Sequence, residues 1–403
     1  MTPLDSSPPL NVWRALLALA VVFVLLTTTG WTAVRDQRAP AEAGEAALAA
    51  WTKDRIGSRA LPDPGAPSGR LARFFASIGT QDAVRLADRH PLIVGNLNGA
   101  PLTLRYRANR LALTEALRVE ESRTRDARLS AEGRGEAVRR MHRFASLLQP
   151  GRQILAFDPS GKGRAAEVLG DLDRAQRVSV VVPGVDTNLL TFEKSTRKYT
   201  APVGMAQSLY EAERTASPTT RTAVIAWADY TAPAGVGLDA STGRLAATGA
   251  DRLVAMTESL PGSARVSLFC HSYGSVVCGV AARELPRRVG DLAVAGSPGM
   301  RAESAAQLGT GARVWSMRDS DDWIQDVPYL EVGGLGHGAD PVTPEFGARV
   351  LSAARAVGHA GYFEPGTESL ANFAEIGVGA YGAVSCADGV GACRAGLQGQ
   401  NTA

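Results

Sequence analysis

Short apolar runs alternate with segments of helical spacing over the second half of the chain. One such helix begins near Thr242 and includes Asp251–Leu260. Buried runs that alternate with helices predict an α/β fold, in which a mostly parallel sheet is covered on both faces. Ligands bind such sheets at the carboxyl ends of the strands. The predicted strands are Gln153–Phe157, Val178–Val182, Thr222–Trp227, Val266–Cys270, Leu292–Ala295 and Arg313–Met317.

The pattern before residue 151 is helical instead. Leu71, Phe74, Phe75 and Ile78 share one helix face. We therefore expect a helical region over 71–150, which either packs beside the site or caps it. Residues 35–70 are rich in Ala, Pro and Gly and predict a linker with a short helix around Ala41–Trp51. The α/β domain then spans 151–375, and a Gly/Ala-rich tail spans 376–403.

The N-terminus carries a long uncharged stretch after a polar tail of residues 1–11. No charged residue occurs from Ala15 to Val34, and twenty residues at about 1.5 Å each just span a hydrocarbon core of about 30 Å. Trp13 and Trp31 lie near its ends, as interfacial tryptophans do. We expect residues 12–34 to anchor the chain in the cell membrane as a single transmembrane segment. A cleaved signal peptide, which would leave a secreted protein, is the alternative.

Charge and cysteine content narrow the class of protein. Lys and Arg number 43 and Asp and Glu 40, a balance that argues against a nucleic-acid-binding role. Neither C-x-x-C nor H-E-x-x-H occurs, so no metal and no other cofactor is expected. Cys386 and Cys393 could close a short disulfide loop, which fits an extracytoplasmic body. Cys270 and Cys278 are expected to be small buried residues rather than a bridged pair.

The stretch from Val266 to Leu285 carries the strongest chemical signal. An apolar strand runs into His-Ser-Tyr-Gly and then into an apolar helix, which is the layout of a nucleophile elbow. Such a turn holds its serine, here Ser272, in a strained conformation that exposes the hydroxyl. Gly274 lets strand and helix pass closely, whereas Cys270 stands where the G-x-S-x-G pattern has its first glycine.

A serine nucleophile needs a base and an acid, which follow it in that fold in the order serine, acid, histidine. His359 is the preferred base and His337 the alternative, while His271 should point away from the site. The acid should follow the strand that ends at Met317. Asp322 is preferred because Trp323 and Ile324 after it would anchor the loop; the alternatives are Asp321 and Asp319.

The oxyanion hole is expected to consist of backbone N–H groups. One comes from Tyr273, directly after the nucleophile. The other comes from the loop after Val178–Val182, where Gly184 lets the backbone approach the substrate, so that Val185 is the expected donor.

Several spaced motifs resemble an actinobacterial alpha/beta-hydrolase family that is catalogued as a domain of unknown function. The resemblance covers roughly residues 71–375 and implies that Ser272, Asp322 and His359 form the triad. The family has glycine at the position of Cys270. The matching motifs are Arg89–Pro101 with Arg107–Arg110, Phe157-Asp158, Val182–Gly184 with Thr187, Trp227–Tyr230, His271–Ser275, Gly296–Gly299, Asp322–Ile324, Leu335–Gly338, and Gly358-His359 with Tyr362 and Asn372.

The sequence thus predicts a membrane-anchored or exported serine hydrolase, esterase- or lipase-like, that cleaves an ester or related acyl bond of a small-molecule or lipid-like substrate. A peptidase or amidase using the same triad is one alternative. A non-catalytic envelope-binding protein that retains the fold is the other.

Overall fold

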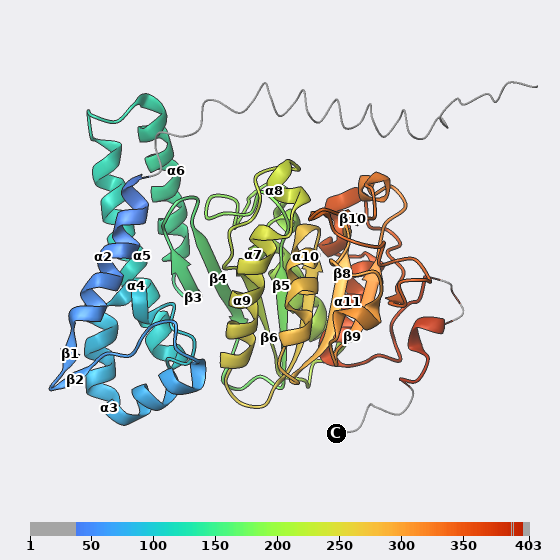
Figure 1. Cartoon of the computed structure of the whole chain (residues 1–403), viewed down its shortest axis with the longest axis horizontal. Coiled ribbons are helices and arrows are strands. Elements are labelled where there is room, and N and C mark those ends of the chain that lie inside the picture. Colours follow the sequence, from blue (N-terminus) through green and yellow to red (C-terminus); the bar gives the residue numbers. More distant parts are fainter. Residues whose placement is uncertain (1–37, 388, 390, 398–403) are drawn as a thin grey trace, which may run out of the picture.

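The computed structural model describes residues 38–387, 389 and 391–397. Its centre is an eight-stranded sheet in the order β12-β9-β8-β7-β5-β6-β4-β3 (Figure 1). Neighbours from β12 to β6 are parallel, and β4 pairs antiparallel with both β6 and β3. The predicted mostly parallel sheet is confirmed. The strands are β3 (Gln153–Asp158), β4 (Arg164–Gly170), β5 (Arg177–Val182), β6 (Thr222–Ala228), β7 (Arg265–His271), β8 (Val289–Ala295), β9 (Arg313–Met317) and β12 (Arg349–Val350).

Helices cover both faces of this sheet, as predicted. Successive side chains of a strand point to opposite faces. Val180 and Leu268 accordingly pack with α9 (Arg244–Ser259) and α10 (Tyr273–Ala281). Val181 and Phe269 pack with α7 (Pro202–Ala216) and α11 (Glu368–Val378) on the other face. The central strands are therefore mostly apolar, with few buried polar positions such as Ser179 and Ser267, because both of their faces are buried.

The N-terminal helical region lies against the β3 edge of the sheet (Figure 1). It has a core of its own, to which Trp51, Phe74 and Leu86 contribute. Two buried polar side chains of α5 join it to β3: Arg105 donates to the carbonyl of Leu155 (2.9 Å) and Asn109 to that of Ile154 (2.9 Å). Its elements are α2 (Arg38–Lys53), the hairpin β1 (Arg55–Ile56) and β2 (Arg59–Ala60), α3 (Ser68–Arg89), α4 (Pro91–Val94), α5 (Leu102–Thr124) and α6 (Ala131–Leu147).

The predicted membrane segment, residues 12–34, lies outside the described residues. Among the helices that the structure does describe, none has the length and apolarity needed to cross a membrane.

Two disulfides cross-link the chain. Cys386 is bonded to Cys393, as the sequence allowed. Cys270 is also bonded to Cys278, so the expectation that these two are unbridged was wrong. The reason is the sharp turn at Ser272, which folds α10 back along β7. The end of the strand and the second turn of the helix thereby come to face each other, with Cα atoms 6.6 Å apart.

Candidate active site

Ser272 lies in the turn between β7 and α10, in a backbone conformation that residues with a side chain rarely adopt. Its φ is 54° and its ψ −129°, which costs about 1–3 kcal/mol. Glycines permit the close packing around it. A Cβ on Gly274 would collide with the backbone oxygen of Val182, and a Cβ on Gly184 would lie 2.6 Å from the Cβ of Ser272. The elbow and the loop after β5 are thus pressed together at the carboxyl ends of the strands.

Three predicted residues meet at this turn. Nε2 of His359 lies 2.8 Å from Oγ of Ser272, and Nδ1 of His359 lies 2.8 and 3.1 Å from the two carboxylate oxygens of Asp322. A carboxylate only accepts hydrogen bonds, so Nδ1 carries the proton and Nε2 is left to accept from the serine hydroxyl. Asp322 begins the short helix Trp323–Asp326 after β9, and His359 lies in the 3₁₀ helix Gly358–Phe363.

The carboxylate of Asp322 is completely buried yet remains charged. Burial alone would raise its pKa, but donors around it outweigh that effect and hold the pKa below its ordinary value. The donors are His359, the hydroxyl of Tyr362 at 2.5 Å and the N–H of Ile324 at 2.9 Å. Asp322 can therefore stabilise a positive charge that develops on His359.

His271 does not point away from the site, contrary to the sequence prediction. Its Nε2 donates to the carbonyl of His359 (2.6 Å), and the two rings lie 4.9 Å apart. Its side chain leaves the sheet on the same face as Phe269, and the 3₁₀ helix that carries His359 folds over that face. Burial lowers the pKa of His271 to about 3, so the ring is neutral and supports His359 without competing with it for charge.

The alternative acids and base lie elsewhere. Asp321 is exposed, and Asp319 accepts from the N–H of Gly358 (2.8 Å), which fixes the loop before His359. His337 donates from Nε2 to the carbonyl of Ala240 (2.7 Å) instead of contacting Ser272. Burial lowers its pKa. The structure thus brings Ser272 together with Asp322 and His359.

The predicted oxyanion donors, Val185 and Tyr273, border the same cavity as Ser272. This cavity measures about 630 Å³, which is the size of a small-molecule site. No Asp, Glu, Lys or Arg lines it. Its lining residues are Val185, Val236, Gly237, Leu238, Ala240, Ser241, Ser272, Tyr273, Pro298, Trp323, Ile324, Val327, Pro328, Leu330, Val332, Leu335, Gly336 and His337.

Comparison with known proteins identifies the family. A family model described as alpha/beta hydrolase matches residues 158–332. An uncharacterized protein of Mycobacterium bovis, Mb0988c, is 30% identical over 198 residues, which are 46% of this chain and 73% of that protein. The chain belongs to the alpha/beta hydrolase family. The matched range includes Ser272 and Asp322, and His359 lies beyond it.

Two further proteins are similar to this alpha/beta hydrolase. The uncharacterized protein Rv2079 of Mycobacterium tuberculosis is 28% identical over 393 residues, or 82% of this chain, but the chain spans only 58% of that protein's length. Among solved structures, a dienelactone hydrolase from Anabaena variabilis is 17% identical, with a TM-score of 0.35 over 55% of this chain and 93% of its own.

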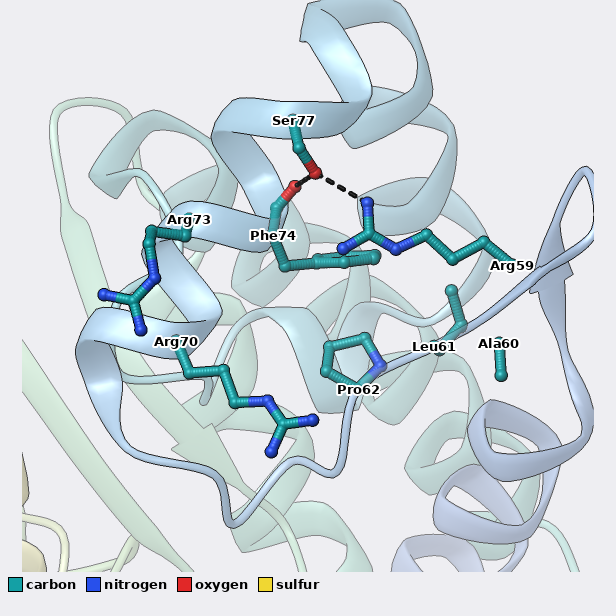
Figure 2. Close-up of a pocket in the computed structure, with 8 residues that line it drawn as sticks. All are labelled: Arg59, Ala60, Leu61, Pro62, Arg70, Arg73, Phe74 and Ser77. Atoms are coloured by element: carbon teal, nitrogen blue, oxygen red, sulfur yellow. Dashed lines mark hydrogen bonds between the residues drawn. The ribbon is translucent and has the colours of Figure 1, made fainter.

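A second hollow of about 520 Å³ lies in the N-terminal region of the hydrolase, between the β2 segment and α3 (Figure 2). Arg59, Arg70 and Arg73 border it around the ring of Phe74. Its one hydroxyl, on Ser77, donates to the carbonyl of Phe74 and accepts from Arg59, so no base is available to activate it. We therefore do not consider this hollow a candidate site for acyl transfer. Nor do the described residues include any group of three or more His, Cys, Asp or Glu side chains that could hold a metal ion.

Residues that sequence reasoning missed complete the site. Tyr362 appeared only as a motif position, without a role. Ser275, fully buried on α10, donates to the carbonyl of Ser272 and contacts the hydroxyl of Ser297 at 2.7 Å, and it thereby ties the elbow to the loop after β8. In the sequence, Ser275 appeared only as the last position of the motif His271–Ser275, without a role.

Proposed function

We propose that this alpha/beta hydrolase is a serine hydrolase that cleaves an ester or related acyl bond. Ser272 Oγ attacks the carbonyl while His359 Nε2 takes its proton. Asp322 orients His359 and stabilises its charged form, and the N–H groups of Val185 and Tyr273 donate to the oxyanion. The proton then passes from His359 to the leaving alcohol, and water activated by His359 releases the acid from Ser272.

The observation that carries this proposal is the continuous hydrogen-bonded series from Ser272 through His359 to Asp322, with both joining distances at 2.8 Å. The strained φ of Ser272 supports it, because such strain costs stability and is found mostly at functional sites. The hydrogen bonds that keep Asp322 charged beside His359 support it too.

Labelling of the full chain in detergent with a fluorophosphonate probe tests the proposal. Wild type should label, Ser272→Ala should not, and His359→Ala should label about a thousandfold more slowly. Labelling that survives His359→Ala but is lost in His337→Ala would assign the base to His337. Folded wild-type protein that does not label would contradict the hydrolase and favour a non-catalytic binding protein. Comparing esters with matched anilides then distinguishes an esterase from an amidase.

We also propose that the catalytic body lies outside the cytoplasm, held by residues 12–34 as an anchor or exported by them as a signal. The bonds Cys270–Cys278 and Cys386–Cys393 support this, because structural disulfides persist in oxidising compartments. Relatives in Mycobacterium support the narrower assignment to the actinobacterial branch of the family. Protease accessibility of the body in intact cells tests the location, and accessibility only after lysis would contradict it.

A further inference from the structure

Six of the eleven exposed large apolar side chains among the described residues line one feature, the Ser272 cavity. Single exposed apolar residues are ordinary on protein surfaces, but a contiguous group marks an interaction site. Val236 is 70% exposed, Leu238 58% and Val332 68%. Together with three further exposed residues of the cavity lining, they form what we call the apolar rim. Its members are Val236, Leu238, Trp323, Leu330, Val332 and Leu335.

The apolar rim is carried by two segments that are fixed to each other. One is the segment around α8 (Leu238–Ser241), and the other carries the hairpin β10 (Glu331–Val332) and β11 (Leu335–Gly336). A bridge between Thr242 and Leu335 and the hydrogen bond from His337 to the carbonyl of Ala240 join them. Tyr273, next to the nucleophile, also donates to the carbonyl of Thr242 at 2.8 Å. Backbone and side-chain hydrogen bonds thus hold the two segments of the cavity wall together and connect them to the elbow at Ser272.

The lining of the cavity is suited to binding an alkyl chain. It has no carboxylate, ammonium or guanidinium in its lining. Its only titratable imidazole, on His337, has a pKa that burial lowers, so that group is neutral at pH 7. Because most of the lining is apolar, a polar acyl group would lose water there and gain few partners, whereas an alkyl chain gains from burial.

The charges beside the apolar rim exclude an anionic surface as its target. Arg244 is paired with Asp239 at 2.8 Å, and Arg301 is paired with Glu331. The carboxylates of Asp321 and Asp326 add negative charge to the neighbouring loop. Attraction to anionic lipid headgroups requires clustered unpaired Lys or Arg, and this rim has none among its lining residues.

We infer that the substrate is a long-chain acyl ester of an uncharged lipid, presented in an aggregate. The alkyl chain occupies the cavity beside Ser272, and the apolar rim inserts into the aggregate surface. This inference rests on the proposed hydrolase function and specifies its substrate class.

The test compares three forms of the full chain in detergent: wild type, the rim variant Val236→Ser with Val332→Ser, and a control variant, Leu48→Ser with Leu111→Ser. The control residues are also exposed apolar side chains but lie on α2 and α5, remote from the cavity. Rates on p-nitrophenyl dodecanoate and p-nitrophenyl butyrate are measured for each form, beside fluorophosphonate labelling of wild type.

Wild type should prefer the dodecanoate, and the rim variant should lose about tenfold of that preference, while the control variant keeps it. Wild type should also act faster on emulsified triacylglycerol when phosphatidylcholine coats the emulsion than when phosphatidylglycerol does. A labelled wild type that prefers butyrate, or a rim variant that matches the control, would overturn this inference and leave the hydrolase standing. A preference for the phosphatidylglycerol emulsion would overturn it too. Absence of labelling would overturn both.

Discussion

The hydroxyl of Tyr362 donates a 2.5 Å hydrogen bond to Oδ2 of Asp322. Tyr362 lies three residues after His359 on the same 3₁₀ helix, in which side chains at i and i+3 eclipse. One short segment therefore supplies both the proposed base, His359, and a second donor to Asp322, and it approaches the carboxylate from one side. This arrangement keeps Asp322 ionised and holds it still.

Replacing Tyr362 with phenylalanine should weaken both effects. In Tyr362→Phe the pKa of Asp322 rises toward its ordinary value, and we expect kcat to fall about tenfold. A carboxyl whose pKa is lower in the folded state than in the unfolded state stabilises the protein at every pH above the unfolded-state pKa, near 4. This contribution disappears as the pH falls through the folded-state pKa. The loss in unfolding free energy, about 1–2 kcal/mol at pH 7, should therefore shrink below pH 4 in urea titrations.

Tyr381 provides the matched control. Its hydroxyl donates to the buried carboxylate of Asp291 at 2.8 Å, at the start of β8 and away from the triad. Tyr381→Phe should lose comparable stability and keep its kcat. Equal kcat losses in the two variants would show that the bond from Tyr362 supports the fold and not the triad.

Gly296, directly after β8, is a second position where the site depends on an exact fit. Its φ is 55°, and a Cβ there would lie 2.8 Å from Oδ2 of Asp322 and 3.2 Å from Cε1 of His359. Gly296→Ala should displace these groups, and a displacement of about 1 Å costs about a hundredfold in rate. The comparison is Gly57→Ala, with a φ of 56° and nothing within 4 Å of the added Cβ.

Both alanine variants carry the same backbone strain, so both should lose about 1–2 kcal/mol of stability. Only Gly296→Ala should also lose kcat/KM on a soluble ester. If Gly57→Ala were equally inactive, the loss would come from general destabilisation.

The two disulfides allow a third comparison, since they span similar distances along the chain: eight residues for Cys270–Cys278 and seven for Cys386–Cys393. Replacing either pair with alanine should lower the free energy of unfolding by about 2–4 kcal/mol. Only the first pair braces the strand and helix on the two sides of Ser272, so only its loss should lower kcat. Chemical denaturation and ester kinetics on both double variants check this, and an equal kcat for the two would refute the bracing role.

Strands could be predicted where the sequence forms an apolar run and were missed where it does not. Val178–Val182 is apolar except at Ser179, because helices cover both faces of the sheet. β4 was missed because its sequence, with Glu167 among alanines, has neither an apolar run nor clear alternation. That glutamate is buried at the sheet because it accepts from Arg152 at 2.7 Å, a partner that only the antiparallel pairing with β3 brings near.

The candidate site also has a part that could be predicted from the sequence and a part that could not. Chain order and spacing, with the apolar pair after Asp322, led to the prediction of Ser272, Asp322 and His359, and the structure brings these three side chains together. The contacts of Tyr362 and His271 depend on how the 3₁₀ helix lies over β7, and the Cys270–Cys278 bond depends on how sharply the elbow turns. These are tertiary relationships that no local pattern expresses.

His271 yields the last prediction, which concerns pH. Burial, with a smaller contribution from His359, lowers its pKa to about 3, against about 6.5 in an unfolded chain. Above pH 6.5 both states are neutral and His271 adds no pH dependence. As the pH falls from 6.5 toward 3, the unfolded chain takes up a proton that the folded state excludes, so the free energy of unfolding falls by up to about 1.4 kcal/mol per pH unit.

In His271→Gln the amide can still donate to the carbonyl of His359 but does not titrate. In urea unfolding between pH 6 and 4, the free energy of unfolding of the variant should therefore depend less steeply on pH than that of wild type, by the contribution of about one proton. Parallel stability curves for wild type and variant would mean that His271 is charged in the folded protein, which the burial of the ring argues against.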